Sequence, residues 1–238
     1  MLLERLDGLG RIGGAGRLGG AGRFDGAGRF GGDTAPARVV LDVGTGEGQV
    51  ARAIAAGFGW PVLGCDTSWG QLTEARRRGG GPRYVGGSAG ALPMRDSSLD
   101  AAVACLLLEH VADLEVVLGE LARVLRPGGC LLVVLNHPIV STPGSGWIDD
   151  HMVDPPEQYW RLGPYLPEAT TTEEVARGVD LTFHHRPLSR YLNAASELGL
   201  YLTHMGEPPP PDGFVALAPE LSEQATMPRM MLLELTRM

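Results

Sequence analysis

The sequence predicts an α/β protein with a Rossmann-like, doubly wound sheet, and three observations lead to this fold class. A mostly apolar run at residues 39–43 passes through a glycine-rich turn directly into a helix-like segment. After residue 37, apolar runs of strand length alternate with segments of helix length, which is typical of a parallel sheet with helical crossovers. An acid, Asp66, ends the second expected strand about 20 residues after the first glycine of the turn, where such sheets hold a ribose.

Seven strands and four helices are expected after residue 37. The strands are expected near residues 38–43, 61–65, 82–86, 99–105, 130–135, 200–206 and 229–236. The helices are expected near residues 47–57, 69–78, 114–124 and 187–198. Residues 138–185 lie between the fifth strand and the last helix and are rich in proline, aromatic and acidic residues without a clear period. An insertion at this edge of a sheet is a typical place for a substrate-binding cap.

The composition indicates one domain that stays in the cytoplasm. A chain of 238 residues can bury one good core. No apolar run reaches the ~18 residues that a membrane span needs, and the N-terminus lacks the apolar core of a secretory signal. Cys65, Cys105 and Cys130 each lie in an apolar run without C-x-x-C spacing, so we expect reduced core thiols. We expect no membrane partner.

Charge is unevenly distributed along the chain. All 20 basic residues are arginine, which excludes a lysine base or Schiff base. Residues 1–38 hold six arginines and four acids, whereas the remaining chain holds 14 arginines and 24 acids. Because an acidic body is a poor partner for a phosphate backbone, no nucleic-acid partner is expected, although local basic patches stay open.

Residues 1–37 are predicted to be a disordered arm. From Arg11 the chain repeats with a period of six residues, each repeat rich in glycine and carrying one apolar side chain. So much glycine makes ordering costly, and one apolar residue per repeat offers little burial to offset that cost. The domain is therefore expected at residues 38–238, with a cap near 138–185.

The glycine-rich turn indicates a nucleoside-type cofactor. Asp42 precedes Gly44, Gly46 and Gly48, which stand at every second position. Glycines let a ligand approach the backbone closely, and a helix that starts at such a turn favours anionic or nucleotide groups. The dinucleotide fingerprint G-x-G-x-x-G fails here at its third glycine.

With this turn, the chain resembles the class I S-adenosylmethionine-dependent methyltransferases of the type 11 domain. The resemblance continues through residues 86–93, 98–103, 107–113 and 121–129, so that 38–134 are covered without a gap. It implies a seven-stranded, mostly parallel sheet whose last strand is antiparallel. It also implies S-adenosylmethionine as the cofactor.

The resemblance also assigns roles to residues of the cofactor site. Asp42 would help to orient the amino group of the methionine part, and Asp66 would accept hydrogen bonds from both ribose hydroxyls. Ser88 stands where the family usually has aspartate at the adenine amino group, which would weaken that contact. The expected cofactor-binding residues are Asp42, Gly44, Thr45, Gly46, Gly48, Asp66, Thr67, Gln71, Ser88, Ala89, Cys105 and Leu106.

Three histidines are candidates for catalysis. His137 directly follows the fifth expected strand and is the first choice for a general base. His110 follows the fourth strand, where it either shapes the site or makes a structural contact. His151 lies in the cap beside two aspartates, a cluster that suggests a metal site. Metal-dependent relatives take their ligands from the ends of the fourth and fifth strands, so no metal is predicted.

The predicted function is transfer of a methyl group to a small molecule, most simply to an oxygen atom and without a metal. Within the enzyme class, the alternative is methylation of a tRNA or a protein. From another class, the alternative is a degenerate cofactor-binding scaffold. That alternative rests on Ser88 and on the glycine repeats at the place where the family has a helix covering the cofactor. A homodimer is left open.

Overall fold

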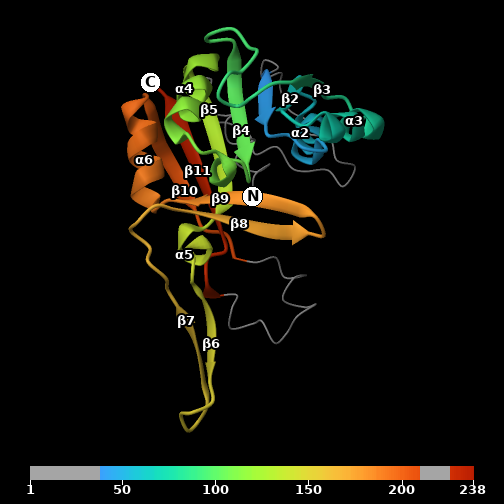
Figure 1. Ribbon diagram of the computed structural model, residues 1–238. Helices are drawn as coiled ribbons and strands as arrows, with labels where there is room; N and C mark the ends of the chain where they lie inside the picture. The colour runs from blue at the N-terminus through green and yellow to red at the C-terminus, as the bar shows by residue number, and fades with distance from the viewer. Residues whose placement is uncertain (1–37, 210–225) are drawn as a thin grey trace, which may run out of the picture.

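In the computed structural model, which describes residues 38–209 and 226–238, one seven-stranded sheet forms the centre of the protein (Figure 1). The order of its strands is β10-β11-β5-β4-β1-β2-β3. The strands are β1 (Val40–Val43), β2 (Val62–Asp66), β3 (Arg83–Gly86), β4 (Leu99–Cys105), β5 (Leu125–Asn136), β10 (Leu200–Gly206) and β11 (Met230–Arg237). These are the seven strands that the sequence predicts.

The pairing confirms the predicted mostly parallel sheet. β1 pairs in parallel with β2 and β4, and β4 pairs in parallel with β5. β11 runs antiparallel to both β5 and β10. Val43 at the end of β1 is in register with Cys65 and Ala104, each one residue before the end of its strand. The carboxyl ends of β1, β2 and β4 therefore meet at one edge of the sheet.

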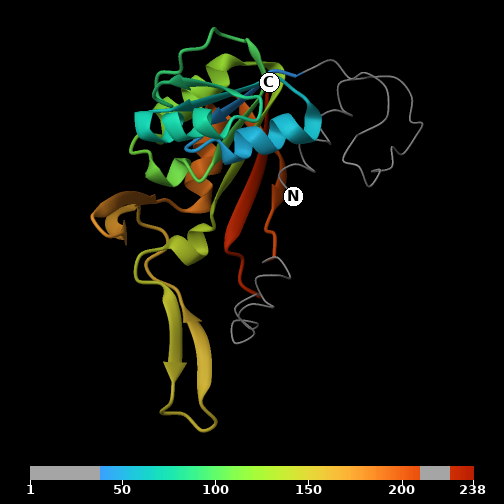
Figure 2. The same ribbon diagram turned by 90° about the vertical axis from the view of Figure 1, so that its right-hand side faces the viewer.

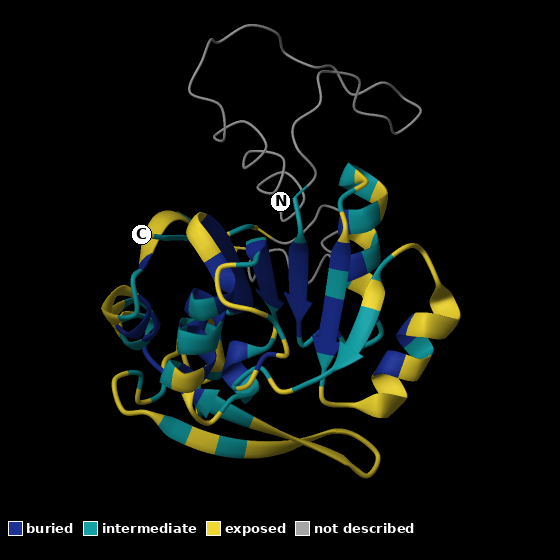
Figure 3. Ribbon diagram, turned by 90° about the horizontal axis from the view of Figure 1, so that it is seen from above, coloured by how far each residue is buried: buried dark blue, intermediate teal, exposed yellow. Residues whose placement is uncertain are grey.

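Helices cover both faces of the sheet, and Figure 3 shows its buried strands between them. The helices are α2 (Gln49–Phe58), α3 (Trp69–Arg78), α4 (Leu114–Val124) and α6 (Leu188–Glu197). Side chains alternate between two cores because successive residues of a strand point to opposite faces. Leu41 packs in the core under α4 and α6, whereas its neighbour Val40 packs in the core under α2.

The region expected to be a cap contains two hairpins that the sequence did not predict as strands. β6 (Gly146–Asp150) pairs with β7 (Glu157–Arg161), and β8 (Ala169–Ala176) pairs with β9 (Val179–His185). Both hairpins project from the lower end of the sheet, which two perpendicular views show (Figures 1 and 2). Most of their residues are exposed, so the apolar periodicity that marks a core strand is missing.

Three further expectations concern the N-terminal arm, the cysteines and membrane-spanning helices. The predicted arm at residues 1–37 lies outside the described residues. The same holds for the place where the family has a helix that covers the cofactor. Cys65 and Cys130 are buried in the core, as expected, and Cys105 is partly buried. Within the described ranges, none of the helices has the length and apolar character to span a bilayer.

Candidate active site

Two acids hold the glycine-rich turn after β1. Oδ2 of Asp42 accepts hydrogen bonds from the Thr45 hydroxyl at 2.6 Å and from the Ala51 backbone N–H at 3.1 Å. Oδ2 of Asp66 accepts one from the Gly46 backbone N–H at 2.8 Å. The turn is thereby fixed both to its own helix and to the carboxyl end of β2.

Two of the glycines are required by close packing as well as by backbone conformation. Gly44 has a φ of 69°, and a Cβ there would lie 2.9 Å from Cδ1 of Leu107. Gly48 has a φ of 76°, and a Cβ there would lie 2.3 Å from the hydroxyl of Tyr84. Both φ values lie in the left-handed region that favours glycine. The side chain of Tyr84 thus fills the space beside Gly48, and a contact of Gly48 with a cofactor stays a prediction.

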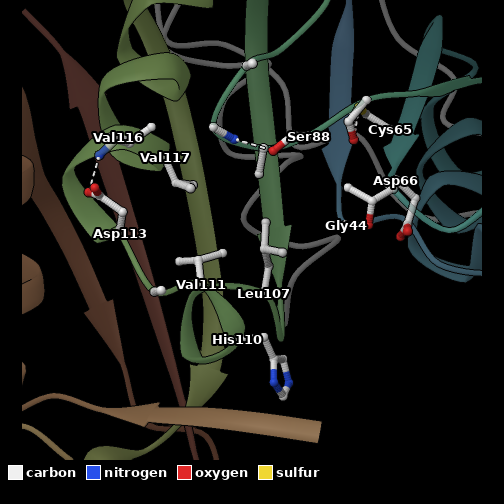
Figure 4. Close-up of a pocket in the computed structure, with 16 residues that line it drawn as sticks. Gly44, Cys65, Asp66, Ser88, Leu107, His110, Val111, Asp113, Val116 and Val117 are labelled. Carbon is white, nitrogen blue, oxygen red and sulfur yellow. Dashed lines mark hydrogen bonds between the residues drawn. The ribbon is translucent and has the colours of Figure 1, made fainter. Parts of the chain in front are cut away.

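A cavity of about 550 Å³ opens at the carboxyl edge of the sheet, between the ends of β1, β2 and β4 and the start of α4 (Figure 4). Its volume lies in the range of about 300–1,000 Å³ that is typical of small-molecule sites. Five of the predicted cofactor residues and one of the predicted catalytic residues lie at its wall: Gly44, Asp66, Thr67, Ser88, Ala89 and His110.

Asp66 is placed to bind a ligand with two hydroxyl groups. Its Oδ1 accepts a hydrogen bond from the Ser68 N–H at 2.8 Å, and its Oδ2 accepts the one from Gly46. An ionised carboxylate offers about four acceptor sites, so each oxygen keeps capacity for one more donor. The helix-capping role is taken by Ser68, whose hydroxyl accepts from the Gln71 N–H. Asp66 is therefore not needed as the cap of α3.

The opposite end of the cavity is formed by a tight turn and by apolar side chains. The hydroxyl of Ser88 accepts a hydrogen bond from the Gly90 N–H at 3.2 Å, and the Ser88 backbone bridges to Ala91. Val116 and Val117 at the start of α4 face the same space. This end combines an apolar wall with exposed backbone groups, which suits a flat heterocycle.

The remaining predicted cofactor residues surround this cavity without lining it. Asp42 and Thr45 are buried and paired with each other. Gln71 lies near the glycine turn, with its Oε1 4.0 Å from the position of a Cβ on Gly46. Cys105 and Leu106 end β4, and Leu106 adopts a φ of 53° with 44% of its surface exposed. Their contacts with a cofactor stay predictions.

His110 has a defined tautomer. It lies in η1 (Leu108–His110), and its Nδ1 is 2.9 Å from the carbonyl oxygen of Thr182 in β9. A carbonyl only accepts, so Nδ1 carries the proton and Nε2 of the neutral ring is an acceptor. His110 thus combines the two roles that the sequence left open, because it makes a structural contact and lies at the wall of the cavity.

His137 occupies a different environment from the one that a free base needs. Its Nδ1 accepts a hydrogen bond from the Ile139 N–H at 3.1 Å, where it caps the short helix α5 (Pro138–Ser141). Its Nε2 therefore carries the proton and lies 2.9 Å from Oε1 of Glu207. Because both ring nitrogens are engaged, this geometry does not favour His137 as the base.

His151 lies in the turn between β6 and β7 and is exposed. Figures 1 and 2 both place that turn at the end of the hairpin that points away from the sheet. The structure therefore does not bring His151 to the cavity. Oδ1 of its neighbour Asp149 accepts from Gln158, and Oδ1 of Asp150 accepts from the Met152 N–H.

Two buried polar residues of the site were not singled out from the sequence. Arg186 is 4% exposed and donates to the carbonyl oxygens of Leu108, Val111 and Ala112 at 2.7–3.2 Å. It thereby holds the loop after β4 that forms one wall of the cavity. Oε1 of Glu109 accepts from the backbone and side-chain N–H groups of Asn136 at the end of β5. A lone arginine and a lone glutamate carry no sequence signal for burial.

Burial changes the acid–base properties at this edge. It raises the pKa of Asp42 from 3.8 to about 6, although the hydrogen bonds from Thr45 and Ala51 oppose the shift. Burial, with the nearby carboxylates of Asp42 and Glu109, raises the pKa of the Cys105 thiol to about 11. Cys105 is therefore a neutral thiol at pH 7 and not an activated nucleophile.

The raised pKa of Asp42 predicts a pH-dependent stability. The folded protein holds this proton more tightly than the unfolded chain does, so stability is lost as the pH rises from about 4 to about 6. The loss amounts to about 3 kcal/mol and persists above pH 6. The variant Asp42→Asn keeps an oxygen acceptor without ionising. Its free energy of unfolding relative to the wild type, measured in urea from pH 4 to pH 8, should rise over that interval. A difference that is constant with pH would contradict this prediction.

Comparisons with known proteins agree on one family. Residues 41–133 match the family model of a methyltransferase domain. A methyltransferase described as S-adenosylmethionine dependent, from Mesorhizobium loti, superposes with a TM-score of 0.74 and 29% identity, over 84% of this chain and 91% of that one. Residues 41–133 of this chain therefore match a methyltransferase domain, in a fold shared with an S-adenosylmethionine-dependent methyltransferase. The family assignment from the glycine turn is thereby confirmed, and with it the fold.

The curated relatives match only part of this chain. Demethylmenaquinone methyltransferase from Parafrankia sp. is 38% identical over 119 residues, which is 42% of this chain and 46% of the relative. Malonyl-[acyl-carrier protein] O-methyltransferase from Xylella fastidiosa is 38% identical over 113 residues, 45% of this chain and 37% of the relative. The chain thus spans less than half the length of these two relatives.

The residues at the wall of this cavity fit the adenosyl part of S-adenosylmethionine. Asp66 retains acceptor capacity for two ribose hydroxyls, and the apolar side of the cavity is lined by Leu107, Val111 and Val116. The Gly44 backbone is open to the cavity without a Cβ. Among residues 38–209 and 226–238, no three His, Cys, Asp or Glu side chains gather as metal ligands. The expectation of transfer without a metal stays a prediction.

Proposed function

We propose that this protein transfers a methyl group to a small molecule, with an oxygen atom as the acceptor and without a metal. The observation that carries the use of S-adenosylmethionine is Asp66, which lines the cavity and is held by hydrogen bonds to the glycine turn on one side and to Ser68 on the other. The names of the relatives support separate parts of it: one is named for demethylmenaquinone, a small molecule, and another is named as an O-methyltransferase.

For methyl transfer, the main task of the protein is to position the acceptor relative to the methyl group. Bound S-adenosylmethionine supplies an activated methyl group. The chain must hold an acceptor in line with it and exclude water, and good orientation can lower a barrier by about 7–11 kcal/mol. A positioned base adds about 10²–10⁴-fold when the acceptor is a hydroxyl. The cavity that would hold both molecules lies at the carboxyl ends of β1, β2 and β4.

We assign the base role to His110 because its tautomer leaves Nε2 unprotonated at the wall of the cavity. The variant His110→Asn can still donate to the Thr182 carbonyl but has no basic nitrogen. We expect it to bind S-adenosylhomocysteine within threefold of the wild type and to methylate 2-naphthol about 100-fold more slowly. The measurement is transfer of radiolabel from S-adenosylmethionine. Transfer at the wild-type rate would rule out His110 as the base.

Two other functions remain as alternatives. A degenerate, cofactor-binding scaffold would keep the cavity but show no transfer, and Ser88 at the adenine end is the feature that favours it. Methylation of a tRNA or a protein would need a surface for the macromolecule. The malonyl-[acyl-carrier protein] relative is named for a protein-bound acceptor, whereas the 24 acids against 14 arginines after residue 38 disfavour a nucleic acid.

The first test is a calorimetric titration of the full chain with S-adenosylmethionine, S-adenosylhomocysteine and NAD. Micromolar binding of the first two and none of NAD is the expected result. It would justify a search among hydroxylated small molecules. If neither S-adenosylmethionine nor S-adenosylhomocysteine bound at millimolar concentration, the proposed function would fail. The protein would then be interpreted as a scaffold without turnover.

A further inference from the structure

The β8–β9 hairpin contacts the wall of the cavity at His110. His110 donates its Nδ1 proton to the Thr182 carbonyl, and its ring centroid lies 4.6 Å from that of Phe183. Figure 4 shows His110 directly beside the orange ribbon of this hairpin, and Figure 1 shows the hairpin crossing below the ends of the central strands. The hairpin therefore lies next to the cavity at His110.

The two faces of the hairpin differ in chemistry. One face carries polar pairs, with the Thr170 hydroxyl 3.1 Å from Nδ1 of His184 and the Thr172 hydroxyl 3.4 Å from that of Thr182. The other face carries Phe183, which contacts His110. Since side chains alternate along a strand, Leu181 shares the face of Phe183. Phe183 is partly covered, whereas Leu181 is 39% exposed.

The charges of the hairpin are mostly negative. Residues 169–185 contain three acids and one arginine, namely Glu173, Glu174, Asp180 and Arg177. Glu173 is in register with Leu181 and therefore lies on the same face. A carboxylate in this position repels an anion and accepts a hydrogen bond from a neutral hydroxyl or amine.

We propose that the face formed by Phe183, Leu181 and Glu173 is one wall of the acceptor site, and that the acceptor is an apolar molecule without negative charge. This inference rests on the proposed function and names its substrate class. Continuity argues for the acceptor as the occupant, because the face begins at His110, which also borders the cofactor cavity. The acids on the hairpin argue against an anionic acceptor.

The test uses two probes of equal ring size that differ in charge, 2-naphthol and 2-naphthoate. Each is titrated into the full chain saturated with S-adenosylhomocysteine, and binding is followed by calorimetry. We expect 2-naphthol to bind at least tenfold more tightly than 2-naphthoate. Leu181→Asp should weaken 2-naphthol binding by about tenfold or more, which is the size of one lost leucine contact. Thr172→Asp adds the same charge on the opposite face and should change the affinity for 2-naphthol less than threefold.

Three results would overturn the inference. They are equal or tighter binding of 2-naphthoate, an equal loss in Leu181→Asp and Thr172→Asp, and no binding of either probe. Each variant is also titrated with S-adenosylhomocysteine, whose binding should not change. Intact binding of S-adenosylhomocysteine with a failed probe experiment refutes the hairpin wall alone. Loss of S-adenosylhomocysteine binding by the wild type refutes the proposed function instead.

Discussion

Replacing Asp66 with alanine is expected to weaken the binding of S-adenosylhomocysteine by about 10²–10⁴-fold. Two ribose hydroxyls each lose a hydrogen bond to a charged group, and such bonds contribute about 1.5–3 kcal/mol apiece. The Gly46 and Ser68 N–H groups lose their acceptor as well, which loosens the turn that borders the cavity. Calorimetric titration of the variant measures the change.

Two ligands that differ by one hydroxyl group distinguish the loss of the hydrogen bond between Asp66 and the ribose from the effect of a loosened glycine turn. The analogue of S-adenosylhomocysteine that lacks the 2′-hydroxyl should bind the wild type more weakly than the parent compound. It should bind Asp66→Ala about as well as the parent compound does. The control variant is Asp149→Ala, which removes an acid of the β6–β7 hairpin and should leave affinity unchanged. If Asp66→Ala bound like the wild type, the assignment of this site would be wrong.

Replacing Arg186 with methionine is expected to lower the free energy of unfolding by about 3–5 kcal/mol. The side chain of Arg186 is almost fully buried and satisfies the carbonyl oxygens of Leu108, Val111 and Ala112. Methionine fills a similar volume but leaves these three acceptors without a donor, at a cost of about 1–3 kcal/mol each. Urea unfolding measures the loss. Affinity for S-adenosylhomocysteine should fall as well, because the same loop forms a wall of the cavity.

The neighbouring Arg190 provides the control. It pairs with Glu115 and Glu168, but a third of its side chain is exposed. Exposed ion pairs typically contribute about 0–1 kcal/mol, so Arg190→Met should cost less than 1 kcal/mol. An equal loss in the two variants would mean that Arg186 acts as an ordinary ion pair and not as the anchor of the loop.

The local elements of the fold could be predicted from the sequence because each has a local cause. α4 was expected at residues 114–124 and spans Leu114–Val124, where the Asp113 side chain accepts from the Val116 N–H and caps its first turn. β4 was expected at 99–105 and spans Leu99–Cys105 in the middle of the sheet. Apolar period, caps and glycines act over a few residues, and they agree with the final fold.

The two hairpins of the region expected to be a cap could not be predicted in the same way. β8 and β9 are stabilised by pairing with each other and by the contact of His110 with Phe183, rather than by burial of every second side chain. A hairpin with two largely exposed faces carries no apolar alternation in its sequence. Its strands, and the different chemistry of its faces, become visible only when the register is known.

The sequence by itself determined the positions of the strands, the glycine turn and the acid at the end of β2, because each of them leaves a local pattern of a few residues. The tertiary structure decided which histidine has a free nitrogen. His137 is bound to Glu207, 70 positions away, and His110 to Thr182, 72 positions away. Arg186 reaches Leu108 across 78 positions. The topology alone brings such partners together, so the protonation and orientation of these side chains are properties of the folded chain.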